Sequence, residues 1–424
     1  MKKIITHINN KFLKIDLQFL IKNSFYNISA YIISIACTLA VTYIIANNIN
    51  EHETGVYRYI FSWYGVLGSL MLSGITSALT ISIAKGFNSL KRAFIYKGWF
   101  SLIGVFTSLG IGAYYFANGN SELFWGFTIL AVSMPILELS GLYTSFLQGR
   151  EDFKSSSKFL IVNKVASLVC IVFFVFALKL TNSYILLFSN ITIIGIIQLL
   201  YIYSLHKKLE DTSTQPTIDK ELLKNSIHYS LMGIVFALGT QADKLILFQF
   251  FGSAALASYW IATTIPTEAQ RFISQISNIY LPRFVHTDIG NRAFKKKFTY
   301  ILLASTFAMT ILTAVYYFSA PLIFSYLFPK YMEAISLSRL FFAVVILTPV
   351  SIVWYIFLAQ EHLGKNYLYH IGDPVIQILL YILFVYTFKL GILGIVIAVL
   401  AKNFIVGAIG VYLLLTHKEK LKAV

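Results

Sequence analysis

The chain has 424 residues, of which 57% are hydrophobic and 12% are charged, and its mean hydropathy is +0.72. Soluble proteins average about 25% charged residues, so this composition excludes a soluble multidomain enzyme, and its hydrophobicity excludes a disordered chain. The net charge of +16 would indicate nucleic-acid binding in a soluble protein. In a multi-pass membrane protein, basic cytoplasmic loops explain it, so no nucleic-acid partner is expected.

The first 23 residues predict an amphipathic segment at the cytoplasmic membrane surface. Apolar residues recur there at helical spacing, and Lys3, Lys11 and Lys14 lie between them. No small-residue cleavage site follows, and Asn and Asp interrupt the apolar run. We therefore do not expect a removed signal peptide.

Twelve apolar stretches follow, each close to the length of about 20 residues that a membrane helix needs. They predict spans at 24–46, 56–82, 98–117, 123–148, 157–178, 183–205, 225–250, 254–281, 298–320, 336–359, 366–388 and 391–415. We expect an all-α integral membrane protein made of two six-helix lobes, at 24–205 and 224–415. A polar cytoplasmic linker at 206–223 joins the lobes, and a cytoplasmic tail at 416–424 ends the chain.

The distribution of basic residues predicts the orientation. With the N-terminus inside, the inner segments hold 25 of the 34 Lys and Arg residues, and Lys97 is counted among these. The outer ends hold four, which are Arg58, Lys179, Lys330 and Lys389. Because Lys and Arg accumulate in cytoplasmic loops, we expect both termini on the cytoplasmic side.

The two lobes resemble each other in sequence. Aligning Tyr57 with Tyr259 and Phe146 with Phe357 gives offsets of 202 and 211 residues, close to half the chain. An even number of helices per repeat gives both copies the same orientation. Parallel repeats are related by an axis along the membrane normal, so we expect a substrate cavity between the lobes.

Ionisable residues inside the spans are the candidate site residues, because an unpaired charge is costly there. Glu268 and Arg271 are three apart on helix eight, so they share a face and can pair. Pro266 just before them can kink the helix. Arg271 is expected near mid-membrane, and its guanidinium matches phosphate oxygens bidentately. Two interpretations stay open, a pyrophosphate site with Glu268 as the resting partner of Arg271, and a structural ion pair.

Four further cations are candidates for a positively charged cavity: Lys244, Lys402, Lys164 and Arg58. Asp243 and Lys244 are neighbours that point to different faces, so they are not expected to neutralise each other. Lys402 lies at the middle of helix twelve, too far from either surface to reach it easily. Lys164 and Lys244 can also extend to the membrane surface, and Arg58 at the outer mouth can also anchor to headgroups.

Two further acids, Glu138 and Asp373, each lie close to a proline in their helix. A carboxylate beside broken backbone suits a H⁺ or Na⁺ site. Equally, each of them can pair with Lys164 or Lys402. The acids that are candidates for ion coupling or ion pairing are therefore Glu268, Asp243, Asp373 and Glu138.

Several chemistries are missing from the sequence. It has no P-loop and no HExxH or CxxC motif. Its two cysteines, Cys37 and Cys170, both lie in apolar runs and are too few for a disulfide framework. We predict no catalytic residues, no metal and no cofactor.

Short motifs recur along the chain in a characteristic order: Gly55-Val56-Tyr57-Arg58-Tyr59, Gly74-Ile75 with Ala84-Lys85-Gly86, Leu147-Gln148-Gly149-Arg150, and Ala242-Asp243-Lys244-Leu245 through Gly252 to Tyr259. The chain resembles polysaccharide-biosynthesis flippases of the Wzx type in these motifs, in its twelve predicted spans and in its midpoint linker. The resemblance covers nearly the whole chain. These flippases belong to the multidrug/oligosaccharidyl-lipid/polysaccharide exporter (MOP) superfamily.

The resemblance implies a transporter rather than an enzyme. Its implied activity is to move an undecaprenyl-pyrophosphate-linked oligosaccharide, of O-antigen or capsule type, between leaflets by alternating access. The implied direction is from the inner to the outer leaflet of the bacterial cytoplasmic membrane. Its implied partners are the lipid bilayer and other surface-polysaccharide assembly proteins, such as a polymerase or a chain-length regulator, and a monomer is expected.

Two alternatives stay open. A cation-coupled multidrug antiporter of the same superfamily relies, by resemblance, on an acid in the first helix, and the span at 24–46 contains no charged residue. A polytopic surface-glycan polymerase or ligase would need a large outer loop with candidate acid, base or phosphate-binding groups. The predicted outer loops are too short for that.

Overall fold

The computed structural model describes residues 17–209, 219–284, 289–360 and 363–417, and the elements in these ranges are helices. The first 16 residues of the predicted amphipathic segment lie outside the described residues. So do 210–218 of the predicted linker and 418–424 of the predicted tail.

The N-terminal half begins each of several helices with a polar cap. The side-chain oxygens of Asn50, Asn120 and Asp152 accept hydrogen bonds of 2.7–3.0 Å from the backbone N–H three residues later. Such caps satisfy N–H groups that have no partner in the first turn. The helices are α2 (Leu17–Asn48), α3 (Glu51–Leu70), α4 (Ile75–Ala84), α5 (Leu90–Ala117), α6 (Ser121–Gly149), α7 (Phe153–Val172) with the π-helical turn η1 (Phe173–Ala177), and α8 (Ser183–Leu209).

The C-terminal half begins with the long helix α9 (Leu222–Phe284), which bends at Gly252. Gly252 has φ +87° and ψ 177°, a conformation that residues with a Cβ rarely adopt. The later elements are α10 (Arg292–Leu327), η3 (Pro329–Ala334), α11 (Ile335–Phe342), α12 (Val344–Leu347), η4 (Thr348–Ser351), α13 (Ile352–Ala359), α14 (Leu363–Tyr381) with the π-helical turn η5 (Ile382–Thr387), and α15 (Gly391–Leu415).

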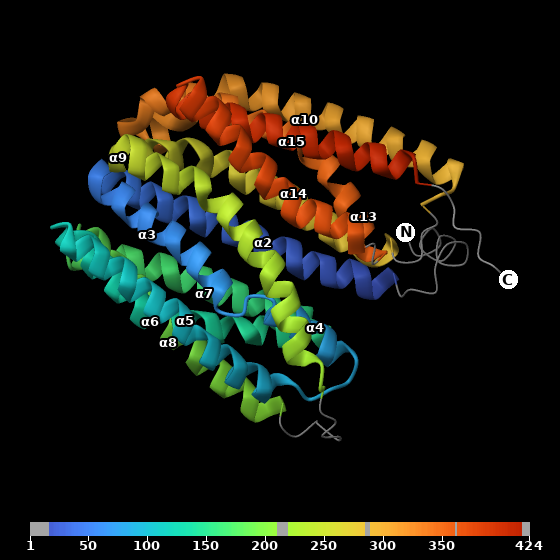
Figure 1. The fold of residues 1–424 in the computed structure, drawn as a ribbon, viewed down its shortest axis with the longest axis horizontal. Coiled ribbons are helices and arrows are strands. Elements are labelled where there is room, and N and C mark those ends of the chain that lie inside the picture. Colours follow the sequence, from blue (N-terminus) through green and yellow to red (C-terminus); the bar gives the residue numbers. More distant parts are fainter. Residues whose placement is uncertain (1–16, 210–218, 285–288, 361–362, 418–424) are drawn as a thin grey trace.

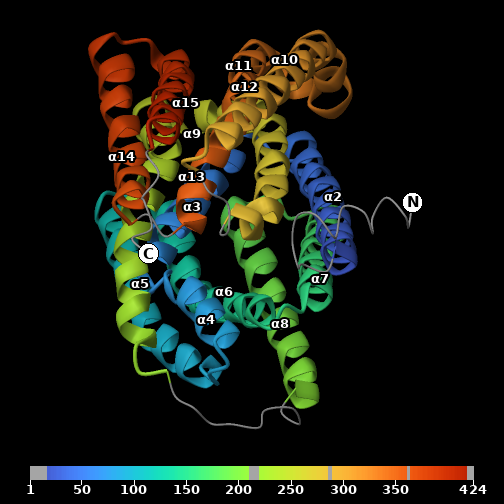
Figure 2. The same cartoon turned by 90° about the vertical axis from the view of Figure 1, so that its right-hand side faces the viewer.

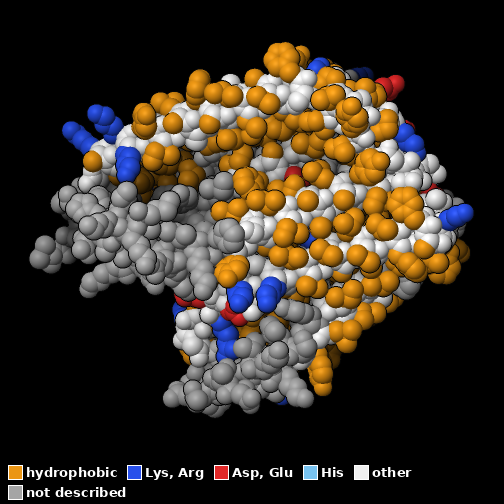
Figure 3. Space-filling view, turned by 180° about the vertical axis from the view of Figure 1, so that it is seen from behind, with side chains coloured by type: hydrophobic (Ala, Val, Ile, Leu, Met, Phe, Trp, Pro, Cys, Tyr) orange, Lys and Arg blue, Asp and Glu red, His pale blue; other side chains and the backbone are white. Residues whose placement is uncertain are grey.

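The chain is a multi-pass membrane protein. Nine helices of the described ranges are long and apolar enough to cross a membrane, or ten if α3 and α4, which are bent by 52°, form one span. Figure 3 shows hydrophobic side chains over much of one face, with Lys and Arg mainly near its margins. A lipid environment explains a surface of this kind, because apolar side chains exposed to water on this scale would aggregate.

The helices form two groups, which Figures 1 and 2 show from two directions. One group contains α4 to α8, and the other contains α10 to α15. Helix α9 joins them, because it packs against α2, α3 and α4 of the first half and against α11, α13 and α14 of the second.

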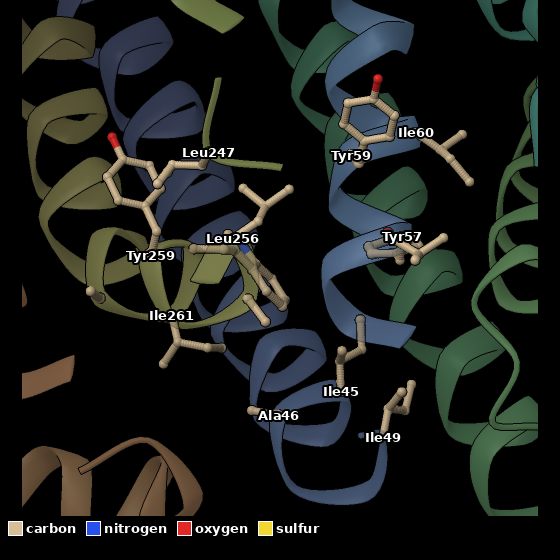
Figure 4. Packing of buried hydrophobic residues seen from close by; sticks show 14 of the residues in the cluster. Ile45, Ala46, Ile49, Tyr57, Tyr59, Ile60, Leu247, Leu256, Tyr259 and Ile261 are labelled. Carbon is tan, nitrogen blue, oxygen red and sulfur yellow. The ribbon is translucent and has the colours of Figure 1, made fainter. Parts of the chain in front are cut away.

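A buried apolar cluster crosses the junction between the halves. It includes Ile45 of α2, Tyr57 of α3, and Leu256 and Ile261 of α9, all labelled in Figure 4. The backbones of α3 and α9 also touch directly, since a Cβ added to Gly55 would lie 2.0 Å from the carbonyl oxygen of Ser253. This packing closes the junction on the side where α3 meets α9.

Hydrogen bonds between the halves lie at the end of the molecule that the charge distribution predicts to be outer. The Lys330 Nζ donates to the Asn47 carbonyl oxygen at 2.6 Å, and the Asn47 Nδ2 donates to the Leu327 carbonyl oxygen at 2.9 Å. His52 Nδ1 lies 2.8 Å from Ser253 Oγ. The halves are therefore joined at this end.

Two helices, one in each half, end in the same way. The π-helical turns η1 and η5 are followed by Lys179 and Lys389, which have φ +52° and +54°. In both places the residue before this lysine donates its N–H to the carbonyl five residues earlier, from Leu178 to Phe173 and from Phe388 to Leu383. The two ends are 210 residues apart, close to the offsets in the sequence alignment.

Candidate functional site

A charged cluster lies where α9 faces the N-terminal half. Arg271 Nη1 donates to Glu268 Oε1 at 2.7 Å, which confirms the pair predicted from their spacing. The Arg271 side chain is 60% exposed and that of Glu268 is 10% exposed. Arg271 therefore has donors left for another partner.

Two cations of the N-terminal half lie within electrostatic reach of this pair. Arg58 of α3 and Lys164 of α7 both interact with the charges of Glu268 and Arg271. The Lys164 Nζ also lies 3.5 Å from Thr38 Oγ1 of α2. Three cations from α3, α7 and α9 thus lie within electrostatic reach of the Glu268 carboxylate, a formal excess of two positive charges. We call Arg58, Lys164, Glu268 and Arg271 the cationic cluster.

Arg58 crosses the junction between the halves. Its guanidinium carbon lies 3.4 Å from the centroid of the Trp260 ring of α9. The Arg58 Nε is buried and makes no hydrogen bond with the described protein. Cation–π stacking holds the plane of the guanidinium and leaves its edge for planar acceptors such as phosphate oxygens.

Lys244 pairs with residues of its own helix, α9, rather than with another helix. Its Nζ lies 3.1 Å from Asp243 Oδ1 and 3.2 Å from the Thr240 carbonyl oxygen. The expectation that the neighbours Asp243 and Lys244 do not neutralise each other is therefore wrong, because the long lysine side chain bends back along α9. Tyr259 also donates to Asp243 Oδ2 at 2.8 Å, so Asp243 has two side-chain partners.

Lys402 and Asp373 form a buried pair within the C-terminal half. The Lys402 Nζ of α15 lies 3.1 Å from Asp373 Oδ1 of α14, and their side chains are 14% and 6% exposed. Asp373 thus pairs with Lys402, one of the two lysines expected as its partner. Gln377 and Tyr381, one and two turns along α14, form a short hydrogen bond beside this pair.

Glu138 pairs with Lys97, which was counted above among the basic residues of the inner loops. Lys97 lies seven residues into α5, is 1% exposed, and has its Nζ 2.7 Å from Glu138 Oε2 of α6. Neither Lys164 nor Lys402 is its ion-pair partner. The signal in the sequence was faint, because Lys97 is followed at once by the long apolar run of α5.

The four pairs differ in what they can bind. The pairs Lys97–Glu138, Lys244–Asp243 and Lys402–Asp373 are each neutral, whereas the cationic cluster has an excess of positive charge. An anion with planar oxygens suits the cationic cluster. In the described ranges, no group of three or more His, Cys, Asp or Glu residues could hold a metal ion, and Cys37 and Cys170 are unpaired and buried.

Solved structures show that the fold is that of a MATE transporter. One is a multidrug resistance MATE family transporter of the MOP superfamily in its inward-facing conformation, with 16% identity, a TM-score of 0.73, and coverage of 92% of this chain and 97% of that chain. A multidrug resistance MATE family transporter of the MOP superfamily in an outward-facing conformation has 17% identity, a TM-score of 0.69, and coverage of 93% of this chain and 94% of that chain. A MOP superfamily transporter from Pyrococcus furiosus has 16% identity, a TM-score of 0.66, and coverage of 94% of this chain and 96% of that chain.

The family assignment rests on a sequence profile. No curated protein sequence matches the chain. The profile described as "Polysaccharide biosynthesis protein" matches residues 20–288, more than half of the chain and all of the N-terminal motifs that carried the resemblance. The chain therefore belongs to the polysaccharide biosynthesis protein family.

Proposed function

We propose that this protein is a flippase for an undecaprenyl-pyrophosphate-linked oligosaccharide, of O-antigen or capsule type, in the cytoplasmic membrane of a bacterium. The observation that carries the proposal is the cationic cluster, in which Arg58 and Lys164 of one half lie within electrostatic reach of Arg271 of the other. The family supports a polysaccharide pathway. Moving several negative charges through hydrocarbon without such cations would be prohibitive.

In this mechanism the pyrophosphate takes the place of Glu268 as the partner of Arg271. Guanidinium groups bind phosphate oxygens through two parallel N–H donors, and Arg58 and Arg271 both supply such donors. Lys164 adds a point charge from α7. The sugars pass through water between the halves while the polyprenyl chain stays in the lipid.

The architecture that we propose has twelve spans in two parallel repeats. Helix α9 supplies two of them, separated at Gly252, and α3 with α4 supplies one. The matched ends at Lys179 and Lys389 support the repeat. Both termini are cytoplasmic, and the closed outer end supports an inward-facing state for this conformation. The halves rock about α9 to alternate access, and the protein works as a monomer beside a polymerase or a chain-length regulator.

We further propose that acids of the C-terminal half couple transport to H⁺ or Na⁺. Asp243 and Asp373 are buried, and each holds a lysine. When an ion neutralises the acid, Lys244 or Lys402 is released and becomes available to the substrate anion. Glu268 releases Arg271 in the same way.

A multidrug antiporter is the second candidate, and the likeness to multidrug MATE structures favours it. A cationic drug needs acids without a partner, whereas Glu138, Asp243, Glu268 and Asp373 each pair with a cation in the described chain. For the Pyrococcus furiosus transporter of the MOP superfamily, reversed polarity of the binding pocket suggests a different function. In this protein the cationic cluster likewise favours an anionic substrate over a cationic drug.

Deletion of the gene tests the proposal. Single lipid-linked repeat units should accumulate on the inner leaflet, and the wild-type gene should restore export. A polymerase mutant would instead carry single units already outside. A strain with normal export and increased drug sensitivity would favour the antiporter.

A further inference from the structure

A pocket of about 370 Å³, with several polar residues in a largely apolar lining, lies along α3, separate from the cationic cluster. Tyr64 of α3, Lys97 of α5 and Glu138 of α6 line it from one half, and Gly233 and Ala237 of α9 line it from the other. Its volume is in the range of small-molecule sites, which are typically roughly 300–1,000 Å³. Both halves therefore form its wall.

Lys97 brings unused donors to this pocket. The ammonium carries three N–H donors, and among the described residues the Glu138 carboxylate is its one ionic partner. The buried Nζ forms no hydrogen bond of good geometry with the described protein. A buried charge with unused donors is costly unless a ligand or water supplies acceptors.

Glu138 is oriented by its neighbours. Tyr64 of α3 interacts with the charge of Glu138, and a Cβ added to Gly68 of α3 would lie 2.8 Å from Glu138 Oε1. Gly68 thus lets the carboxylate approach the α3 backbone. Gly233 likewise lets the Ser73 hydroxyl approach the α9 backbone, because a Cβ added to Gly233 would lie 2.8 Å from Ser73 Oγ. The missing side chains leave a hollow with polar groups around it.

The chemistry of the pocket suits an uncharged ligand with many hydroxyl groups. Lys97 can donate and Glu138 can accept hydrogen bonds, and Tyr64, Ser69, Ser73 and Thr76 also line the pocket. The Lys97–Glu138 pair is neutral overall, so the pocket lacks the positive excess that suits pyrophosphate in the cationic cluster. We propose that it binds a sugar of the lipid-linked oligosaccharide, an inference that rests on the proposed function.

The pocket and the cationic cluster lie along the same face of one helix. Arg58, Gly65 and Ser69 follow the spacing i, i+7 and i+11, which repeats on one side of an α-helix. At a rise of about 1.5 Å per residue, the pocket lies roughly 10 to 17 Å along α3 from Arg58, toward α4. A ligand with its pyrophosphate at Arg58 and Arg271 therefore extends its sugars toward Lys97 and Glu138.

Binding of two probes tests the inference on the full protein in lipid nanodiscs. One probe is undecaprenyl pyrophosphate, and the other is the lipid-linked oligosaccharide extracted from the native bacterium after deletion of this gene. The variants are Glu138→Gln, Ala237→Phe, which fills the pocket, and the double variant Lys97→Met with Glu138→Gln. The double variant removes both charges together, so it leaves no unpaired buried charge.

The matched controls are Glu333→Gln, at an exposed acid, and Leu238→Phe, at an exposed neighbour of Ala237 on α9. Each pocket variant should raise the Kd of the oligosaccharide probe about tenfold or more, because the Glu138 and Lys97 variants lose hydrogen bonds to charged groups and Ala237→Phe fills the space that the sugar needs. The Kd of undecaprenyl pyrophosphate should change by less than about twofold, as should both Kd values in the controls.

Equal weakening of both probes, or no weakening of either, would overturn the sugar site. So would a wild-type protein that binds the two probes with equal affinity. A Glu138→Gln variant that binds sugar normally but does not export would overturn it as well and would assign Glu138 to ion coupling. A wild-type protein that binds neither probe would overturn the proposed function itself.

Discussion

Arg58 of α3 stacks on Trp260 of α9, with 3.4 Å between the guanidinium carbon and the ring centroid. The contact joins the two halves of the molecule beside the Glu268–Arg271 pair, with which Arg58 also interacts electrostatically. A stacked guanidinium keeps its plane fixed and its edge free. The geometry of the proposed anion site therefore depends on an aromatic residue that carries no charge.

Replacing Arg58 with Lys should reduce export although the charge is kept. An ammonium has neither the planar fork nor the stacking of a guanidinium, and loss of a cation–π contact alone corresponds to roughly tenfold. Export of surface polysaccharide in a complemented deletion strain is the measurement. Arg339→Lys is the control, since Arg339 also stacks, on Tyr317 at 4.3 Å, but lies on α11, far along the chain from the cluster. Full export by the Arg58→Lys strain would contradict the role of the stack.

Reversing the charge of Arg271 should abolish export while the protein stays in the membrane. The side chain is 60% exposed, so the substitution disturbs packing little, whereas it lowers the charge of the cluster by two. Immunoblots of membranes and the surface polysaccharide are compared. The control is Arg292→Glu, at an exposed position at the start of α10. Normal export in Arg271→Glu would remove Arg271 from the site.

The contact between Gly55 and Ser253 predicts a shift in conformation. A Cβ at residue 55 would lie 2.0 Å from a backbone oxygen of α9, so Gly55→Ala is incompatible with the closed outer end. Overpacking costs about 1–3 kcal/mol, which favours the state with this end open about fivefold or more. Labelling of Ser253→Cys from outside by an impermeant thiol reagent should rise. Gly98→Ala, where nothing lies within 4 Å of an added Cβ, should leave labelling unchanged.

Linking the halves at their outer ends should stop transport reversibly. Lys330 and Asn47 touch across the junction, so Asn47→Cys with Lys330→Cys can be joined by a short, reducible bis-thiosulfonate linker. Export should fall with the linked fraction and return on reduction, because alternating access requires this end to open. A pair within one half is the control, Glu53→Cys with Ser183→Cys. Continued export by the fully linked Asn47–Lys330 protein would rule out opening at this end.

The Lys402–Asp373 pair allows structure and function to be separated. Lys402→Met leaves a buried carboxylate without a partner, which should destabilise the protein by about 3–5 kcal/mol. Adding Asp373→Asn should restore most of the melting temperature. If Lys402 also serves the substrate, the stable double variant still exports poorly. Recovery of both stability and export in the double variant would show that the pair is structural only.

Interactions within one helix could be predicted from sequence, because helical geometry fixes which residues are neighbours. Glu268 and Arg271 were paired correctly from their spacing of three. The same rule failed for Asp243 and Lys244, because a lysine side chain is long enough to return to the carboxylate of the preceding residue and to the Thr240 carbonyl. Spacing defines where a side chain starts and not where its charged end lies.

Composition alone established a helical, multi-pass membrane protein, since an apolar chain of this length is stable only where its backbone hydrogen bonds are satisfied within lipid. Tertiary structure decided which charges meet. Lys97 was counted as a loop residue but is buried against Glu138. Arg58 was placed at an outer mouth but stacks on Trp260 and lies within electrostatic reach of Arg271. These partners come from different helices, and hydrophobic periodicity does not encode which faces of two distant helices pack together.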